Sequence, residues 1–417
     1  MRVENPPGVT GSSFIPAKPR RRLIWPMEWL NRLVALPWLK IVVEISPEDL
    51  ARLRALPRDA GTLVACNHPS WTDPFVMFEI SRRWGRCCIW MAARELFSRL
   101  GGYMGKFIRR TGAFSVWRGG PNQDAAAFVR RTLSARDFPV VVFPEGHTFY
   151  LNDVLLPLKP GVAAWAVDTV TEHPDLPVRI VPLVIKYRYI EDIRDRLDAA
   201  VAQMERLVFR HPHAVLPTTQ DDFWHRLYVR LYRVADLILA RQQRLHRFHP
   251  PRSATIDERV HGLCAHIIRG LELRYTGKEG QGGFFDRARH LMTLLADDDD
   301  VQHQKDALDA RFAWALSTFY AGYLQPDSSP ERFAETVMKL LRELTDHVPL
   351  SFRVWRTATV RCGDPIDVNE LVAGTDLTSS AGRRACADRA LEMLSDSMHR
   401  MLEPMVVASG ESFASAG

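Results

Sequence analysis

The sequence contains no uninterrupted apolar run of about 18 residues, the length that a membrane-spanning helix requires. Its most apolar stretch near the N-terminus, residues 23–39, is broken by Glu28, Arg32 and two prolines. A secretory signal is not expected either, because proline-rich residues open the chain and the apolar stretch begins late. The sequence therefore predicts a protein without a spanning helix.

Paired metal-binding spacings are missing from the six cysteines, which also form no dense disulfide framework. Such a pattern is typical of a reduced, cytosolic setting. The sequence has no glycine-rich phosphate loop, and its nearest match to a serine-hydrolase elbow, residues 410–414, lacks the final glycine. The pairs His211 with His213 and His246 with His249 have no suitable metal-binding partners nearby. We therefore expect neither a metal centre nor a hydrolytic serine.

A large excess of charge of one sign is also absent. The net charge is +6 over 417 residues, which is too small to argue for a nucleic-acid partner. An apolar share of 46% and a charged share of 25% are those of an ordinary globular protein. A chain of this length can bury a sizeable core and indicates one large or two modest domains.

Residues 1–40 divide into two parts. Residues 1–20 are rich in proline, glycine and serine, which predicts a disordered tail. Residues 20–22 are three arginines, and they precede an apolar segment that carries tryptophans. Tryptophans flanked by arginines suit the headgroup layer of a membrane, so this segment is either a membrane-interface element or a cap over the core.

Strand and helix patterns alternate through residues 41–190, which predicts an α/β core. Helical spacing takes over from Asp222, so residues 191–350 are interpreted as a helical insertion. Residues 351–405 are expected to return to the core with a closing strand and helix. The predicted strands are residues 41–45, 62–66, 88–92, 114–116, 140–143 and 179–185, and the predicted helices of the core are 47–53, 124–133, 161–169 and 383–402.

A histidine and a carboxylate lie five residues apart in the run Asn67-His68-Pro69-Ser70-Trp71-Thr72-Asp73. The run follows a predicted strand, and ligand sites of open α/β sheets cluster at the carboxyl ends of strands. His68 can take a proton from an alcohol, and Asp73 can fix its tautomer and stabilise the imidazolium. Asp73 is also suited to be the N-cap of the helix that Pro74 begins, and the two roles are compatible.

A second motif, Phe143-Pro144-Glu145-Gly146, follows another predicted strand. With the His68–Asp73 pair it resembles the glycerolipid acyltransferase family, typified by 1-acylglycerol-3-phosphate acyltransferases. That family has four sequence blocks in a fixed order, and similar blocks occur here at residues 67–73, 112–118, 141–146 and 180–185. A segment similar to a Lys-x-Gly helix start, residues 158–161, and a final strand and turn, residues 360–366, complete the likeness.

The resemblance implies a mixed-sheet acyltransferase core and an O-acyltransferase reaction. The donor would be acyl-CoA or acyl-carrier protein, and the acceptor would be the hydroxyl of a lysophosphatidate-type glycerolipid in phospholipid biosynthesis. It also implies a ternary complex without an acyl-enzyme and no metal or prosthetic group. Peripheral attachment to the cytoplasmic side of a membrane is expected from the tryptophans, the basic flank and the prolines of residues 20–39. The resemblance says nothing of the oligomeric state.

The same resemblance assigns roles to individual residues. His68 is expected to be the catalytic base, with Asp73 as its partner. Arg118 and Lys159 are candidates for holding an anionic group, either the acceptor phosphate or the phosphates of the thioester carrier. Glu145 is expected to bind an acceptor hydroxyl or to brace the loop. Gly146 lets the backbone approach a ligand without a Cβ clash.

The sequence departs from the family pattern after Gly146. The family continues with Thr-Arg-Ser, whereas this chain has His147, Thr148 and Phe149, so an arginine credited with phosphate binding is missing. An acyltransferase for another acceptor, such as a lysophospholipid or an amino-acid lipid, is therefore an alternative. A non-catalytic lipid-binding protein is a second alternative, and tight lipid binding without turnover would favour it.

Overall fold

The computed structural model describes residues 14–98, 102–116, 122–209, 222–295, 300–319, 322–345 and 354–410. The chain divides into two compact units. Ser12–Glu191 and Arg353–Gly417 form one of them, here called the sheet unit. Asp192–Phe352 belongs to the other, here called the helical unit. The predicted insertion, residues 191–350, differs from these bounds by one residue at its start and two at its end.

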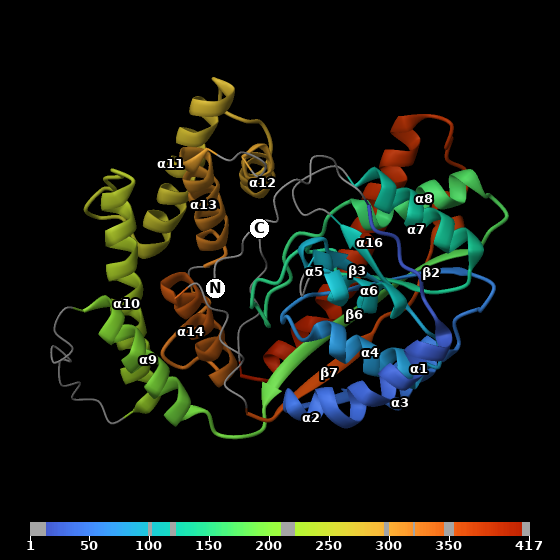
Figure 1. Ribbon diagram of the computed structural model, residues 1–417, viewed down its shortest axis with the longest axis horizontal. Helices are drawn as coiled ribbons and strands as arrows, with labels where there is room; N and C mark the ends of the chain where they lie inside the picture. Colours follow the sequence, from blue (N-terminus) through green and yellow to red (C-terminus); the bar gives the residue numbers. More distant parts are fainter. Residues whose placement is uncertain are drawn as a thin grey trace. The chain divides into compact units, whose positions relative to one another are not determined.

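The described residues of the sheet unit form an eight-stranded mixed sheet in the order β1-β7-β6-β2-β5-β3-β4, with β8 paired to β6. Strands β7, β6, β2 and β3 of this sheet are labelled in Figure 1. Strands β6, β2, β5, β3 and β4 run parallel, whereas β7 runs antiparallel to β6. The predicted α/β class with a mixed sheet is therefore confirmed. The strands are β1 (Ile41–Ile45), β2 (Gly61–Cys66), β3 (Ile89–Ala93), β4 (Ala113–Val116), β5 (Val140–Val142), β6 (Val178–Tyr189), β7 (Arg356–Cys362) and β8 (Ile366–Asp367).

Helices cover both faces of this sheet, which explains why its central strands read as unbroken apolar runs. Successive residues of β2 alternate between two cores, with Leu63 and Ala65 in one and Val64 and Cys66 in the other. The helices that supply the first core are α7 (Gln123–Ala135), α8 (Gly161–Glu172), α15 (Val368–Val372) and α16 (Ser380–Val407). Those that supply the second are α2 (Leu36–Trp38), α3 (Pro47–Arg54) and α4 (Asp73–Trp84).

The residues just before α1 (Arg21–Leu30) pack against the sheet unit rather than forming a loose tail. Ile15 and Ser115 exchange hydrogen bonds, from Ile15 N to Ser115 Oγ at 2.8 Å and from Ser115 N to Ile15 O at 2.9 Å. Because β4 is the last strand of the sheet, this contact satisfies part of its open edge. The predicted disordered tail is therefore wrong for residues 14–20, and residues 1–13 lie outside the described residues.

Among the helices that the structure describes, none combines the length and apolar character needed to cross a bilayer. In the sheet unit a π-helical turn, η1 (Asn31–Ala35), joins α1 to α2, and the shorter helices are α5 (Glu95–Ser98), α6 (Tyr103–Arg110) and α15 (Val368–Val372). The helical unit contains α9 (Arg194–Val208), α10 (Phe223–Leu245), α11 (Ile256–Thr276), α12 (Phe284–Leu294), α13 (Val301–Leu316) and α14 (Pro330–Thr345).

Strand β6 is longer than the sequence indicated. The apolar pattern predicted a strand ending at residue 185, but β6 continues to Tyr189 and pairs with β7 along this extension, with Tyr189 opposite Arg356. Residues 186–189 alternate polar and aromatic side chains, which is a strand signal, but the apolar run that defined the predicted strand ends before them. The helical unit is thus inserted between two strand ends that are direct neighbours in the sheet.

Candidate active site

The turn after β2 places the candidate site at the carboxyl edge of the parallel strands. Strand β2 ends at Cys66, and α4 begins at Asp73. Asn67 fixes the start of the turn against β6, because its Nδ2 donates to Ile185 O at 3.0 Å and its Oδ1 accepts from Ile185 N at 2.7 Å. A side-chain amide thus takes over the pairing where the backbone of β2 leaves the sheet.

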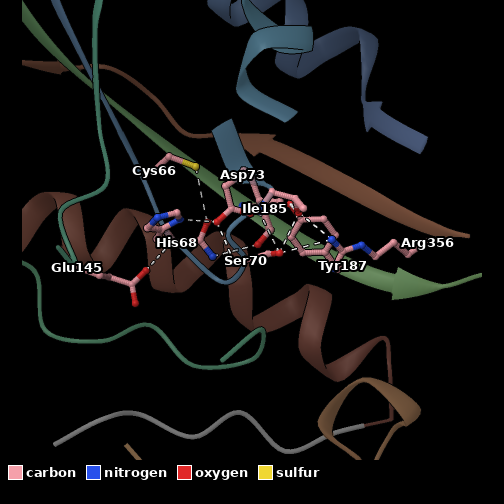
Figure 2. Close-up of polar contacts among 10 residues, drawn as sticks. Cys66, His68, Ser70, Asp73, Glu145, Ile185, Tyr187 and Arg356 are labelled. Carbon is pink, nitrogen blue, oxygen red and sulfur yellow. Dashed lines mark hydrogen bonds and ion pairs between the residues drawn. The ribbon is translucent and has the colours of Figure 1, made fainter. Parts of the chain in front are cut away.

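His68 and Asp73 face each other across this turn (Figure 2). The distance from His68 Nδ1 to Asp73 Oδ2 is 2.7 Å, and Asp73 is buried. A neutral imidazole that donates its Nδ1–H to this carboxylate leaves Nε2 as a proton acceptor. The pair therefore has the arrangement of a general base with an orienting carboxylate.

Glu145 braces the turn from the neighbouring strand. One carboxylate oxygen, Oε1, accepts from His68 N at 2.6 Å, and the other, Oε2, accepts from Leu156 N at 3.2 Å. Burial raises the pKa of Glu145 to about 8, although the two N–H donors act in the opposite direction. Of the two roles expected for Glu145, these contacts match the bracing of the loop.

Residues 49–186 match the model of a family described as Acyltransferase. The chain carries an acyltransferase-family domain. The matched segment contains His68, Asp73 and Glu145, and the family implies an acyl donor and an acceptor as substrates. No curated protein matches the chain.

Within the acyltransferase-family segment, Asp73 is not the helix N-cap that its position in the sequence predicted. The N-cap of α4 is Thr72, which makes no side-chain capping bond. Asp73 Oδ2 accepts from Ser70 N at 2.9 Å as well as facing His68, and Oδ1 accepts from Tyr187 Oη at 2.6 Å. The predicted N-cap is therefore wrong, because both carboxylate oxygens are directed into the turn and toward β6.

The imidazole of His68 is also held from one side by an aromatic ring. Phe143, which follows β5, stacks on it with the ring centroids 4.2 Å apart and the planes 17° apart. Stacking restricts rotation of the ring about its χ2 angle, and the contact to Asp73 then fixes which nitrogen faces the carboxylate. The motif at residues 143–146 thus contacts His68 through both Phe143 and Glu145.

Gly146 and Lys159 lie together beside the Glu145 turn. The backbone of Gly146 has φ +76°, and a Cβ there would come within 2.4 Å of Lys159 Cε and Nζ. Lys159 is half-buried, and its N–H donates to Pro144 O at 2.9 Å. Gly146 therefore makes room for the Lys159 side chain, whereas the sequence suggested room for a ligand.

The remaining predicted residues have separate outcomes. Arg118 lies outside the described residues. His147 and Phe149, which replace the family's Thr-Arg-Ser, contact each other edge to face with their ring centroids 5.3 Å apart, and Phe149 is buried. Within the described ranges, no group of three or more histidines, cysteines and acids is placed to hold a metal ion.

Two residues of the site were missed by the sequence analysis. Tyr187 lies on β6 beyond the predicted end of that strand, and Arg356 begins β7. Arg356 Nη2 donates to Thr72 Oγ1 at 2.7 Å, and its guanidinium lies 4.2 Å from the centroid of the Tyr187 ring. Burial and the nearby Asp73 charge raise the pKa of Tyr187 well above its ordinary value, so its phenol stays protonated and donates.

Proposed function

We propose that this acyltransferase moves a fatty acyl group from acyl-CoA or acyl-carrier protein to the hydroxyl of a lysophosphatidate-type glycerolipid, in phospholipid biosynthesis. The observation that carries the proposal is the His68 Nδ1 to Asp73 Oδ2 contact of 2.7 Å, made inside the acyltransferase-family segment. With Nδ1 directed at Asp73, the imidazole has Nε2 left to accept the proton of an alcohol.

The reaction follows from the second ring nitrogen of His68, Nε2, which does not face Asp73. The acceptor hydroxyl donates to Nε2, and its oxygen attacks the thioester carbonyl while the proton passes to the imidazole. Asp73 stabilises the imidazolium that forms. When the tetrahedral intermediate collapses, the C–S bond breaks and the leaving thiolate takes the proton from His68. The products are an ester and a free thiol, and the enzyme regains its starting state without an acyl-enzyme.

The acceptor phosphate is assigned to Lys159 together with Arg118. Lys159 is supported by its place beside Gly146 and Glu145, which puts a cation next to the turn that contacts His68. A single ammonium is a point charge rather than a bidentate fork, so selectivity for a phosphate is weaker than with two arginines. The replacement of the family's arginine by neutral groups at residues 147–149 favours a less charged acceptor as the alternative.

Attachment to a membrane surface is proposed to be peripheral, on the cytoplasmic side, and to use α1, η1 and α2. One side of this segment is buried against the sheet unit through Ile24 and Leu36. Large apolar side chains cover the other side, with Trp25 exposed by 64%, Leu33 by 67% and Trp38 by 59%. Exposed tryptophans beside the arginines at residues 20–22 suit a headgroup layer with anionic lipids.

A panel of donors and acceptors tests the proposed reaction. Purified protein is assayed with labelled acyl-CoA and acyl-carrier protein against lysophosphatidate, a zwitterionic lysolipid and a neutral monoacylglycerol, with the His68→Ala variant as the blank. We expect the highest kcat/KM with lysophosphatidate. A preference for a zwitterionic or neutral acceptor contradicts the assigned acceptor, and tight lipid binding without turnover by any pair contradicts acyl transfer itself.

A further inference from the structure

The carboxylate of Asp73 is enclosed by groups from three parts of the sheet unit: the turn at residues 67–73, β6 and β7. We propose that Tyr187 and Arg356 form a positioning pair, which holds Asp73 and through it keeps the His68 imidazole with Nε2 toward the acceptor. The proposal rests on the proposed role of His68 as the base of acyl transfer. Both residues are about 5% exposed, so they act through Asp73 rather than on substrate.

The register of β6 is what brings Tyr187 to this position. Cys66, the last residue of β2, pairs with Leu183, so β6 runs on beside the turn after its partner strand has ended. The backbone groups of Ile185 are met by the Asn67 carboxamide. The Asn152 carboxamide meets those of Tyr187 in the same way, donating from Nδ2 to the carbonyl at 2.9 Å and accepting from the N–H at 2.7 Å.

These two carboxamides satisfy the backbone at the end of β6 on the side where, among the described residues, no strand pairs with it. Buried backbone groups must find partners, and each amide supplies one donor and one acceptor at the spacing of a sheet ladder. The phenol of Tyr187 therefore approaches Asp73 from a fixed backbone. Its hydroxyl occupies Oδ1, which leaves Oδ2 to His68 and to Ser70 N (Figure 2).

Arg356 locks the opposite side of the phenol. Its Nη2 bonds Thr72 Oγ1, and Thr72 Oγ1 in turn lies 3.1 Å from Tyr187 Oη. Its guanidinium also stacks over the Tyr187 ring, which is a favourable cation–π contact in a buried site. Arg356 is thus linked to Asp73 through Thr72 and Tyr187, and it supplies a positive charge near a carboxylate that has no cation in direct contact among the described residues.

The kinetic consequence is a loss in kcat with little change in KM. Without the Tyr187 hydroxyl, Oδ1 of a buried carboxylate loses its donor and the carboxylate can turn about its Cβ–Cγ bond. His68 then samples the tautomer in which Nε2 carries the proton and cannot accept another. Substrate binding is unaffected, because neither Tyr187 nor Arg356 is placed to touch a ligand.

The kinetic test compares Tyr187→Phe, Arg356→Gln and Arg356→Lys with Arg361→Gln as the matched control. Arg361 lies on the same strand but is half-exposed and pairs with Asp49 at 2.9 Å. We expect kcat to fall on the order of 10- to 100-fold for Tyr187→Phe and Arg356→Gln, as for other residues that orient a reactive side chain. Arg356→Lys should recover part of this loss, and Arg361→Gln should match the wild type.

A second readout does not depend on turnover. Nitrogen-15 NMR of labelled histidines reports which ring nitrogen is protonated, and the His68→Gln spectrum identifies the signals of His68. We expect one tautomer, protonated at Nδ1, in the wild type and a mixture in Tyr187→Phe. If the tautomer changes but no acyl transfer is found in the wild type, the positioning pair stands and the proposed function fails. Folded variants with wild-type kcat and an unchanged tautomer overturn the pair.

Discussion

At the residue scale, the buried carboxylate of Asp73 collects three hydrogen bonds from groups that differ in kind. A backbone N–H, a phenol and an imidazole all donate to it, so it is satisfied before any substrate arrives. This set of donors leaves one orientation for the carboxylate. The orientation of His68, and hence the acceptor nitrogen, follows from that arrangement.

Asp73→Asn is expected to remove nearly all acyl transfer while leaving the fold in place. An asparagine keeps the shape, but its amide donates, so the amide and the His68 Nδ1–H compete and the imidazole changes tautomer. We expect kcat to fall on the order of 10³- to 10⁴-fold. Steady-state kinetics measure acyl transfer, and circular dichroism measures whether the fold is kept. Activity within a few-fold of the wild type would contradict the assigned role.

Glu145→Gln is expected to change the pH dependence of stability. The folded pKa of Glu145, about 8, lies above its ordinary value of 4.5, so the folded state keeps a proton that the unfolded state releases. The resulting stabilisation is complete below pH 4.5 and is lost as pH rises through 8, at no more than about 1.4 kcal/mol per pH unit. Glutamine does not titrate, so the stability of the variant lacks this pH dependence.

Thermal unfolding of wild type and Glu145→Gln from pH 5 to 8 measures the difference. The Tm of the wild type should fall relative to that of the variant as the pH rises. Parallel curves would show that Glu145 is ionised throughout this range, and its two N–H donors would then outweigh its burial.

Lys159→Gln is expected to weaken the use of a phosphate-bearing acceptor. A charge-assisted contact to phosphate contributes about 1.5–3 kcal/mol, which corresponds to a fall in kcat/KM of about 10- to 160-fold for lysophosphatidate. A neutral monoacylglycerol serves as the control acceptor and should be used equally well by both proteins. An equal loss with both acceptors would instead indicate a disturbed turn at Gly146 and Glu145.

At the scale of single elements, the segment made of α1, η1 and α2 is packed on one side and exposed on the other. Ile24 and Asn31 face the sheet unit, and Asn31 Nδ2 donates to Phe75 O at 2.9 Å. The sequence left open whether this segment caps the core or meets a membrane. The packed side supports the cap, and the exposed side leaves the membrane role as a proposal, because an amphipathic helix can have both.

Replacing Trp25, Leu33 and Trp38 together by serine is expected to reduce vesicle binding. These side chains are exposed, so the triple variant should keep its fold, which deletion of the whole segment would not guarantee. Sedimentation with vesicles that contain anionic lipid measures binding, and Leu308→Ser, another exposed apolar position, is the control. Equal sedimentation of the triple variant and the wild type would contradict the proposed attachment.

At the scale of the whole molecule, the helical unit interrupts the sheet unit at a point where the sheet is continuous. Tyr189 pairs with Arg356, and Ile190 N donates to Trp355 O at 2.9 Å. The ends of β6 and β7 therefore meet as the two arms of an antiparallel hairpin. Such a pair can be closed by a loop of about 2–5 residues.

A chain in which residues 191–354 are replaced by a short Asn-Gly linker is expected to fold. The two cores on either side of the sheet contain only residues of the sheet unit, so none of their apolar contacts is removed. Circular dichroism and a cooperative melting transition measure the outcome. A shortened chain that stays unfolded would show that the sheet unit depends on the helical unit. Acyl transfer by a folded shortened chain would show that the sheet unit alone holds the substrates.

The sequence by itself determined the parts of the site that are local. The strand before His68, the five-residue spacing to Asp73 and the strand before Glu145 follow from apolar patterns and from motif order. The contact of His68 with Asp73 spans a single turn, so a short stretch of chain settles it. The α/β class followed for the same reason, because alternation of strands and helices is a local property.

Only the tertiary structure decided which distant residues complete the site. Glu145 reaches the His68 N–H from the next strand, Tyr187 depends on the register of β6 against β2, and Arg356 returns after the helical unit. Strand order and register are set by the packing of whole faces, and no spacing along the chain encodes them. The N-cap expected of Asp73 failed for the same reason: the partners that take its oxygens come from other elements.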